Sequence, residues 1–206
     1  VYNVALGALA SYDYAAVKSA VAALPGSTPR VSRFVYNDKA QLVYAIDAAG
    51  AVTRNWYDAS GRITKTAGYS TLYTVAFSAD ASTWKATLDA WAPSGDQTRI
   101  NYHYYNGRDE LAYTINAEGY VTGFGYDAEG RLTTENRYSA KLTPNDSWTW
   151  ASVNGANKDG ARTTTTAYDN LGRFQYVQDA AGRFEYFTYY ANGARAGKIE
   201  GTWANQ

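Results

Sequence analysis

Apolar and polar residues alternate over short stretches along most of the chain, and the stretches are separated by polar, glycine-containing turns. A period of two is typical of β-strands that bury one face. In the first group the alternation places strands near residues 31–36, 42–46, 52–57 and 63–69. Strands joined in sequence by such short turns predict four-stranded antiparallel meanders. The fold class predicted from the sequence is therefore all-β dominated.

The turns share one motif that occurs nine times, in three triplets with steps of 10 and then 11 residues. In most copies, position zero is Tyr or Ile, position one is Asp or Asn, position four is Gly and position six is apolar. An Asp or Asn side chain caps a turn by accepting backbone N–H groups, and Gly supplies the left-handed conformation that closes a type I turn with a bulge. Positions zero and six should then face each other across the strand pair. The motif predicts turns at 37–40, 47–50, 58–61, 106–109, 116–119, 127–130, 169–172, 179–182 and 190–193.

A longer repeat lies above the short one, because Tyr36 recurs as Tyr105 after 69 residues and as Tyr168 after a further 63. Between the meanders, polar caps followed by apolar residues at helical spacing predict helices. We expect these helices at 14–24 and 81–91, with a shorter one around 146–153. The repeat predicts modules 1–68, 69–137 and 138–206, stacked as a continuous spiralling, solenoid-like sheet with short helical insertions.

One spacing inside the meanders is odd. The apolar residue after the second turn and the aromatic residue before the third are five positions apart in the sequence. In a regular strand this odd offset would place the two side chains on opposite faces. A β-bulge absorbs one residue and restores the common face. The spacing predicts a bulge in each of the strands 52–57, 121–126 and 184–189.

The composition narrows the class of protein. There are 20 Tyr, 6 Trp and 6 Phe but no Cys and no Met. We therefore expect no disulfide or thiolate site, and we expect the chain to be part of a longer protein. Its terminal strands should pair with further repeats of the same chain or with neighbouring copies. The formal net charge is zero and no apolar stretch is long enough to span a bilayer, which predicts neither nucleic-acid binding nor membrane insertion.

Three copies of the motif, Tyr57–Ile63, Tyr126–Leu132 and Tyr168–Phe174, have the form Tyr-Asp-x-x-Gly-Arg-apolar. They resemble the YD repeat of bacterial Rhs proteins, toxin-complex cocoon components, wall-associated proteins and teneurins. The resemblance implies a large spiralling sheet in a secreted or cell-surface bacterial protein, where it forms a shell or fibre that encapsulates, spaces or displays other domains. It also implies a C-terminal toxin or other cargo outside this chain, and possible partners among glycans.

The sequence predicts no enzyme, no cofactor and no catalytic, cofactor-binding or metal-binding residue. His103 is the single histidine and is expected at a strand edge or on the surface of the sheet. A set of carboxylates could suggest paired acids for glycoside hydrolysis or a calcium loop, but each occupies the capping position of a turn. These carboxylates are Asp47, Asp58, Asp127, Asp169 and Asp179.

Two residue classes leave a binding function open. Arginines that follow turn glycines could form a ladder with carboxylates or tyrosine faces. Trp148 and Trp150 either pack in the core or form sugar-stacking platforms, which gives the alternative function, a glycan-binding adhesion module with exposed aromatic residues. The ladder arginines are Arg62, Arg131, Arg173 and Arg183.

Overall fold

The computed structural model describes residues 19–20, 31–74, 80–93, 95 and 97–203. Its elements are β1 (Arg33–Tyr36), β2 (Leu42–Ile46), β3 (Val52–Tyr57), β4 (Ile63–Tyr69), η1 (Ala81–Thr83), α2 (Trp84–Trp91), β5 (Gln97–Tyr105), β6 (Leu111–Ile115), β7 (Tyr120–Tyr126), β8 (Leu132–Lys141), α3 (Trp150–Gly155), β9 (Arg162–Tyr168), β10 (Phe174–Gln178), β11 (Arg183–Tyr189) and β12 (Arg195–Thr202).

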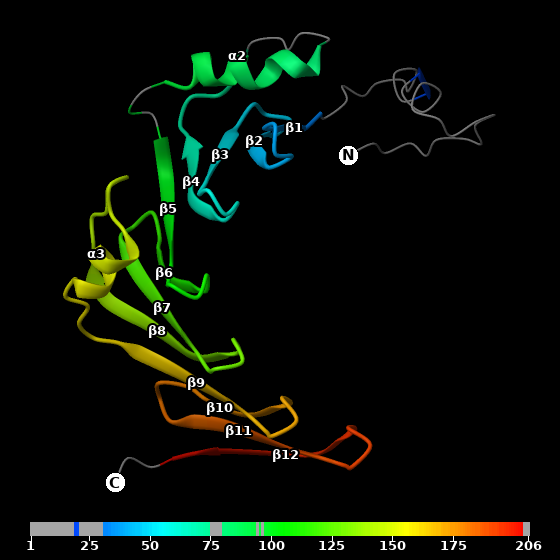
Figure 1. Cartoon of the computed structure of the whole chain (residues 1–206), viewed down its shortest axis with the longest axis vertical. Helices are drawn as coiled ribbons and strands as arrows, with labels where there is room; N and C mark the ends of the chain where they lie inside the picture. The colour runs from blue at the N-terminus through cyan, green and yellow to red at the C-terminus, as the bar shows by residue number, and fades with distance from the viewer. Residues whose placement is uncertain (1–18, 21–30, 75–79, 94, 96, 204–206) are drawn as a thin grey trace. The chain divides into compact units, whose positions relative to one another are not determined.

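Hydrogen-bonded neighbours in the sheet follow the order of the chain, from β1 to β12, as the colours of Figure 1 show. Each pairing whose register the structure defines is antiparallel. The all-β prediction is confirmed, and the helices among the described residues are few and short. None of the helices in the described parts of the chain is long and apolar enough to cross a membrane.

All nine predicted turns are present. In each, the N–H of position four donates to the carbonyl of position one, as in Gly130 to Asp127 at 3.2 Å. Position four has a positive φ throughout, including the two copies where Ala40 (58°) and Asp109 (64°) replace glycine. Positions zero and six pair directly, as predicted, for example Tyr126 with Leu132. The local chemistry of the motif thus determines the hairpins.

The capping role of Asp and Asn is confirmed as well. Asp127 Oδ1 accepts the N–H groups of Glu129 and Arg131 at 3.1 and 2.9 Å, and most other copies repeat this arrangement. In the last copy Tyr190 stands at the capping position, and Asn192 accepts the N–H of Ala194 in its place.

The bulges predicted in the strands 121–126 and 184–189 are wrong in position, whereas the bulge predicted in 52–57 stays a prediction. In modules 2 and 3 the extra residue lies after the third turn, at Thr133 in β8 and Ala196 in β12, whereas β7 and β11 pair without an insertion near that turn. An equivalent extra residue also follows each first turn. The prediction assumed that the aromatic residue before the third turn shares the core face. Tyr126 instead lies on the face of β7 opposite Val121. There its hydroxyl donates to the backbone carbonyl of Leu111.

The helix predicted at 81–91 is confirmed as η1 and α2, and Asp80 caps it by accepting the N–H of Ser82 at 2.9 Å. Of the helix predicted at 14–24, residues 19–20 are described and are helical, and the rest lies outside the described residues. The third helix begins later than predicted, because Thr149 forms a capping box with Ser152, whereas Asp146 binds a lysine of the sheet.

The chain divides into two compact units. Unit 1 comprises Val1–Arg54 and Gly68–Gln97. Within its described part, α2 lies against β1 and β2 and buries Leu88 completely. The ring of Trp91 lies 5.3 Å from those of Tyr69 and Tyr73. Asp89 of α2 accepts a hydrogen bond from the Tyr44 hydroxyl at 2.7 Å, which helps to hold the helix on the sheet.

Unit 2 comprises Asn55–Ala67 and Thr98–Gln206. Its buried cluster contains Tyr104, Ile115, Val121 and Val153, against which partly buried residues including Trp148 pack. Val153 of α3 is fully buried in this cluster. The segment from β8 to α3 therefore covers the apolar face of β5, β6 and β7.

The second turn of each meander is clamped by the chain that leaves the fourth strand. The N–H of Tyr73 donates to the carbonyl of Gly50 at 2.8 Å, and Leu142 binds Gly119 in the same way. In the last copy, Trp203 binds the carbonyl of Gly182. This clamp recurs in all three copies. The module boundaries themselves (1–68, 69–137, 138–206) stay a prediction.

Candidate functional site

Tyrosine hydroxyls connect successive hairpins along one edge of unit 2. This edge, which we call the hairpin edge, is formed by the turns at 58–61, 106–109, 127–130, 169–172 and 190–193. From the second hairpin of this edge onward, each position-zero tyrosine donates its hydroxyl hydrogen to the carbonyl of position six in the preceding hairpin. The bonds join Tyr105 to Ile63 (2.9 Å), Tyr126 to Leu111 (3.0 Å), Tyr168 to Leu132 (3.1 Å) and Tyr189 to Phe174.

Arginines add a second connection between these hairpins. The Arg62 guanidinium binds Asp58 of its own turn and lies 4.4 Å from the centre of the Tyr105 ring in the next hairpin. Arg131 repeats the arrangement on Tyr168 at 4.8 Å, and Arg173 on Tyr189 at 4.4 Å. The predicted ladder of Arg62, Arg131 and Arg173 is therefore confirmed. Arg183 is not part of it, because it follows a second turn and its side chain forms no ion pair with the described residues.

In the first and third turns of the meanders, the residue at position five matches the Asp or Asn at position one. Where the cap of such a turn is Asp, position five is Arg, and Arg131 Nε donates to Asp127 Oδ2 at 2.7 Å. Where the cap of such a turn is Asn, position five is Glu or Gln, and Asn106 Nδ2 donates to Glu110 Oε2 at 2.7 Å. The charge of each capping carboxylate in these turns is therefore balanced by an arginine of the same hairpin. This pairing explains Asp58, Asp127 and Asp169 without any catalytic role.

The electrostatics of these carboxylates agree with the geometry. Burial alone would raise the pKa of Asp58, but hydrogen bonds from the backbone and guanidinium of Arg62 outweigh it and hold the pKa below its ordinary value. The pKa of Asp127 is lowered in the same way by Arg131. Carboxylates that stay ionised and paired are suited to binding within the fold rather than to proton transfer.

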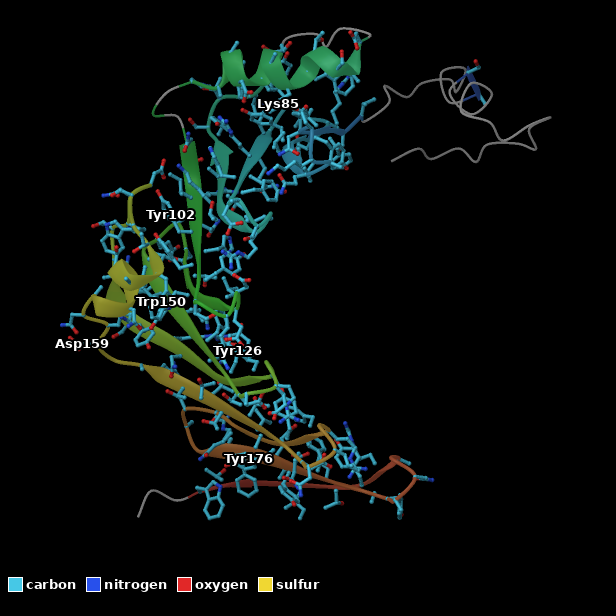
Figure 2. All side chains as sticks on the ribbon, in the orientation of Figure 1. Lys85, Tyr102, Tyr126, Trp150, Asp159 and Tyr176 are labelled. Atoms are coloured by element: carbon cyan, nitrogen blue, oxygen red, sulfur yellow. The ribbon has the colours of Figure 1, made fainter. Side chains whose placement is uncertain are left out.

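A groove of about 550 Å³ lies on unit 2 where the ends of β3 and β4, the strand β5 and the chain before α3 come together. Aromatic rings form much of its wall. Figure 2 labels two of the lining residues, Tyr102 on β5 and Trp150 at the start of α3. The aromatic members are Trp56, Tyr57, Tyr102, Tyr104, Tyr105, Trp148 and Trp150.

A buried lysine lines this groove. Lys65 is 8% exposed, and its Nζ lies 4.6 Å from the centre of the Trp56 ring and 5.7 Å from that of Tyr102. The same nitrogen donates to both carboxylate oxygens of Asp146, at 2.8 and 3.0 Å. The Tyr102 hydroxyl donates to Asp146 Oδ1 at 3.2 Å. The hydrogen bond from Lys65 is the main reason that the pKa of Asp146 is below its ordinary value.

The other candidates from the sequence can now be placed. His103 is a half-buried residue of β5, and burial lowers its pKa. Asp47 and Asp179 cap second turns. Among the residues that the structure describes, no group of three or more His, Cys, Asp or Glu side chains could hold a metal ion. Trp148 packs on the core, and Trp150 is 39% exposed.

Sequence reasoning did not identify Lys65, Tyr102 and Asp146 as one cluster. One signal was present, because Lys65 occupies the same face of its strand as the buried Ala67. A lysine in a core-facing position needs a partner. The partner could not be identified from the sequence, since Asp146 lies 81 residues away.

Comparison with known proteins shows a similarity of fold to solved structures. No family model and no curated protein matches the chain. Among solved structures, TcdB2-TccC3 without its hypervariable C-terminal region matches over 83% of this chain with 14% identity and a TM-score of 0.55. The Tc holotoxin pore of Photorhabdus luminescens matches over 85% with 12% identity and a TM-score of 0.53. This chain spans 8% of the length of each of these chains. Its fold is thus similar to part of a toxin-complex chain.

Proposed function

We propose that the chain is a structural segment of a YD-repeat sheet, similar to those of bacterial Rhs proteins, in a secreted or cell-surface protein. The observation that carries this proposal is the hairpin edge. There, the residues that define the motif, Tyr, Asp, Gly and Arg, bind one another and the neighbouring hairpin. A motif whose members are used to connect repeats is typical of a scaffold.

The similarity to toxin-complex chains supports the same function at the level of the fold. The role we infer is mechanical: the sheet encloses, spaces or displays other domains, such as a toxin or other cargo elsewhere in the protein. Further repeats of the same chain or neighbouring copies would be its partners. An enzymatic function has less support, because the motif carboxylates of unit 2 are engaged in turns and ion pairs.

A scaffold must hold fixed distances, which can be measured within unit 2. The chain has no cysteine, so Glu118→Cys and Ala191→Cys introduce two unique spin-label sites at exposed turns. Double electron–electron resonance should give one narrow distance distribution that is unchanged between low and high salt. A broad or multi-peaked distribution in the folded protein would contradict a scaffolding role.

A further inference from the structure

The groove of unit 2 combines features of a binding site that the hairpin scaffold does not require. Of the aromatic residues on its wall, Trp150 is 39% exposed although it is large and apolar. The Tyr104 hydroxyl at the groove is buried and makes no hydrogen bond with any described residue. Ligand sites are typically concave, mostly apolar and equipped with a few oriented polar groups.

The polar groups are fixed in place. Asp146 is held from one side by Lys65 and Tyr102, yet 71% of its side chain is exposed. Its carboxylate oxygens therefore remain accessible as acceptors. The neighbouring Asn145 has its Oδ1 engaged by the N–H and hydroxyl of Ser147 at 2.9 and 2.6 Å. This bonding orients the amide, whose Nδ2 is a donor that binds no described residue.

The charges of the groove decide between classes of ligand. Its lining contains Arg62 and Lys65 against Asp58 and Asp146, so the formal charges cancel, and each cation is already paired. This does not favour phosphate or another anion. A quaternary ammonium ligand is disfavoured too, because the ammonium group of Lys65 already lies against the rings of Trp56 and Tyr102.

A neutral sugar fits the remaining features. Pyranose rings with equatorial hydroxyls present a flat face of C–H groups, which packs on an aromatic ring, and a rim of vicinal hydroxyls. An accessible carboxylate beside an oriented amide can accept from one hydroxyl and donate to the next. Trp150 supplies the ring, while Asp146 and Asn145 supply the acceptor and the donor.

We propose that this groove binds a neutral pyranose unit of a glycan, with Trp150 as the stacking platform and Asp146 and Asn145 as hydrogen-bonding residues. Lys65 and Tyr102 act as positioning residues that orient Asp146. The inference goes beyond the structural function and does not depend on it. The groove shares wall residues such as Arg62 and Tyr105 with the hairpin edge, but the residues proposed to bind the glycan, Trp150, Asp146 and Asn145, take no part in the contacts between hairpins.

The test begins with an array of neutral and acidic glycans, followed by titration of the intact chain with cellohexaose and chitohexaose while tryptophan fluorescence is recorded. We expect saturable binding of a neutral glycan. Trp150→Ala should weaken it by roughly tenfold or more, with little change in melting temperature because the side chain is exposed at the helix start. Trp203→Ala is the matched control, since Trp203 is 60% exposed and does not line the groove.

Asn145→Ala should also weaken binding without unfolding the protein, and its circular dichroism spectrum should match that of the wild type. The proposal is overturned if no neutral glycan binds, if Trp150→Ala and Trp203→Ala have equal effects, or if only acidic glycans bind and salt abolishes the binding. None of these results would change the spin-label distances that test the scaffold, so the two proposals can fail separately.

Discussion

Replacement of Gly130 by valine should destabilise the protein far more than replacement of Ala59 by valine. Both residues are exposed members of hairpin-edge turns. Gly130 has a φ of 79°, whereas Ala59 is not among the residues with positive φ. A Cβ added at Gly130 would meet nothing closer than Glu110 Oε1 at 3.8 Å. Backbone strain, rather than a steric clash, is therefore the tested effect.

The magnitude follows from the conformation. Left-handed backbone costs an L-residue roughly 1–2 kcal/mol, and a β-branched side chain brings the strain to about 3 kcal/mol. Ala59→Val should stay within about 0.5 kcal/mol, as do most exposed substitutions. Urea denaturation followed by circular dichroism measures both free energies of unfolding. Similar losses for the two variants would refute the left-handed turn and, with it, the physical account of the motif.

At a turn that lacks glycine at position four, introducing glycine should stabilise the protein. Asp109 has a φ of 64°, so Asp109→Gly should relieve strain. The lost ion pair with Arg62 counts for little, because the Asp109 side chain is 76% exposed. We expect a gain of about 0.5–1 kcal/mol after the greater chain entropy of glycine is included. A loss of stability in the same urea assay would show that Asp109 is there for its contacts.

Three further results are expected. Tyr126→Phe removes the hydroxyl bond to Leu111 and should cost about 1 kcal/mol in urea melts. Tyr190→Phe should cost almost nothing, since the Tyr190 hydroxyl binds no described residue, and equal losses would count against the hydroxyl ladder. Gly119→Ala should lower the melting temperature more than Gly130→Ala, because its added Cβ would lie 2.7 Å from the carbonyl oxygen of Leu142; the reverse order would argue against the clamp. Since Lys65 lowers the pKa of Asp146, the ion pair stabilises the fold above the unfolded pKa of about 3.9, and this contribution is lost as pH falls through the lower folded value. The wild type should therefore lose more stability than Asp146→Asn between neutral pH and acid, and parallel profiles would contradict the pairing.

The hairpins could be predicted from the sequence because each depends on residues within one turn. The cap at Asp127, the left-handed Gly130 and the facing pair of Tyr126 and Leu132 lie within seven positions of the chain. Their energies are local, and the motif repeats often enough to be recognised. The helix after Asp80 was predictable for the same reason, since its cap and its apolar spacing are adjacent.

Features that join distant segments could not be predicted in this way. The clamp between Gly119 and Leu142 is a backbone bond, which leaves no mark in residue type. The bulge was predicted in the wrong strand because the side-chain period alone did not show that Tyr126 turns its hydroxyl to Leu111. The groove depends on the approach of the Asp146 segment to Lys65. The only sign of that contact in the sequence is a lysine at a core-facing position of its strand, which indicates that it has a partner but does not identify it.

Residue-resolved hydrogen exchange tests the central claim most directly, namely that the hairpin edge makes successive hairpins of unit 2 one scaffold. If it does, the strand amides of β7, β8, β9 and β10 should exchange through one opening reaction with a common, large free energy. Tyr168→Phe, which removes the hydroxyl bond to Leu132 across the β8–β9 junction, should lower that free energy for all four strands together. If each hairpin opens independently with its own small free energy, or if the Tyr168 variant affects only its own turn, the hairpins do not form a scaffold.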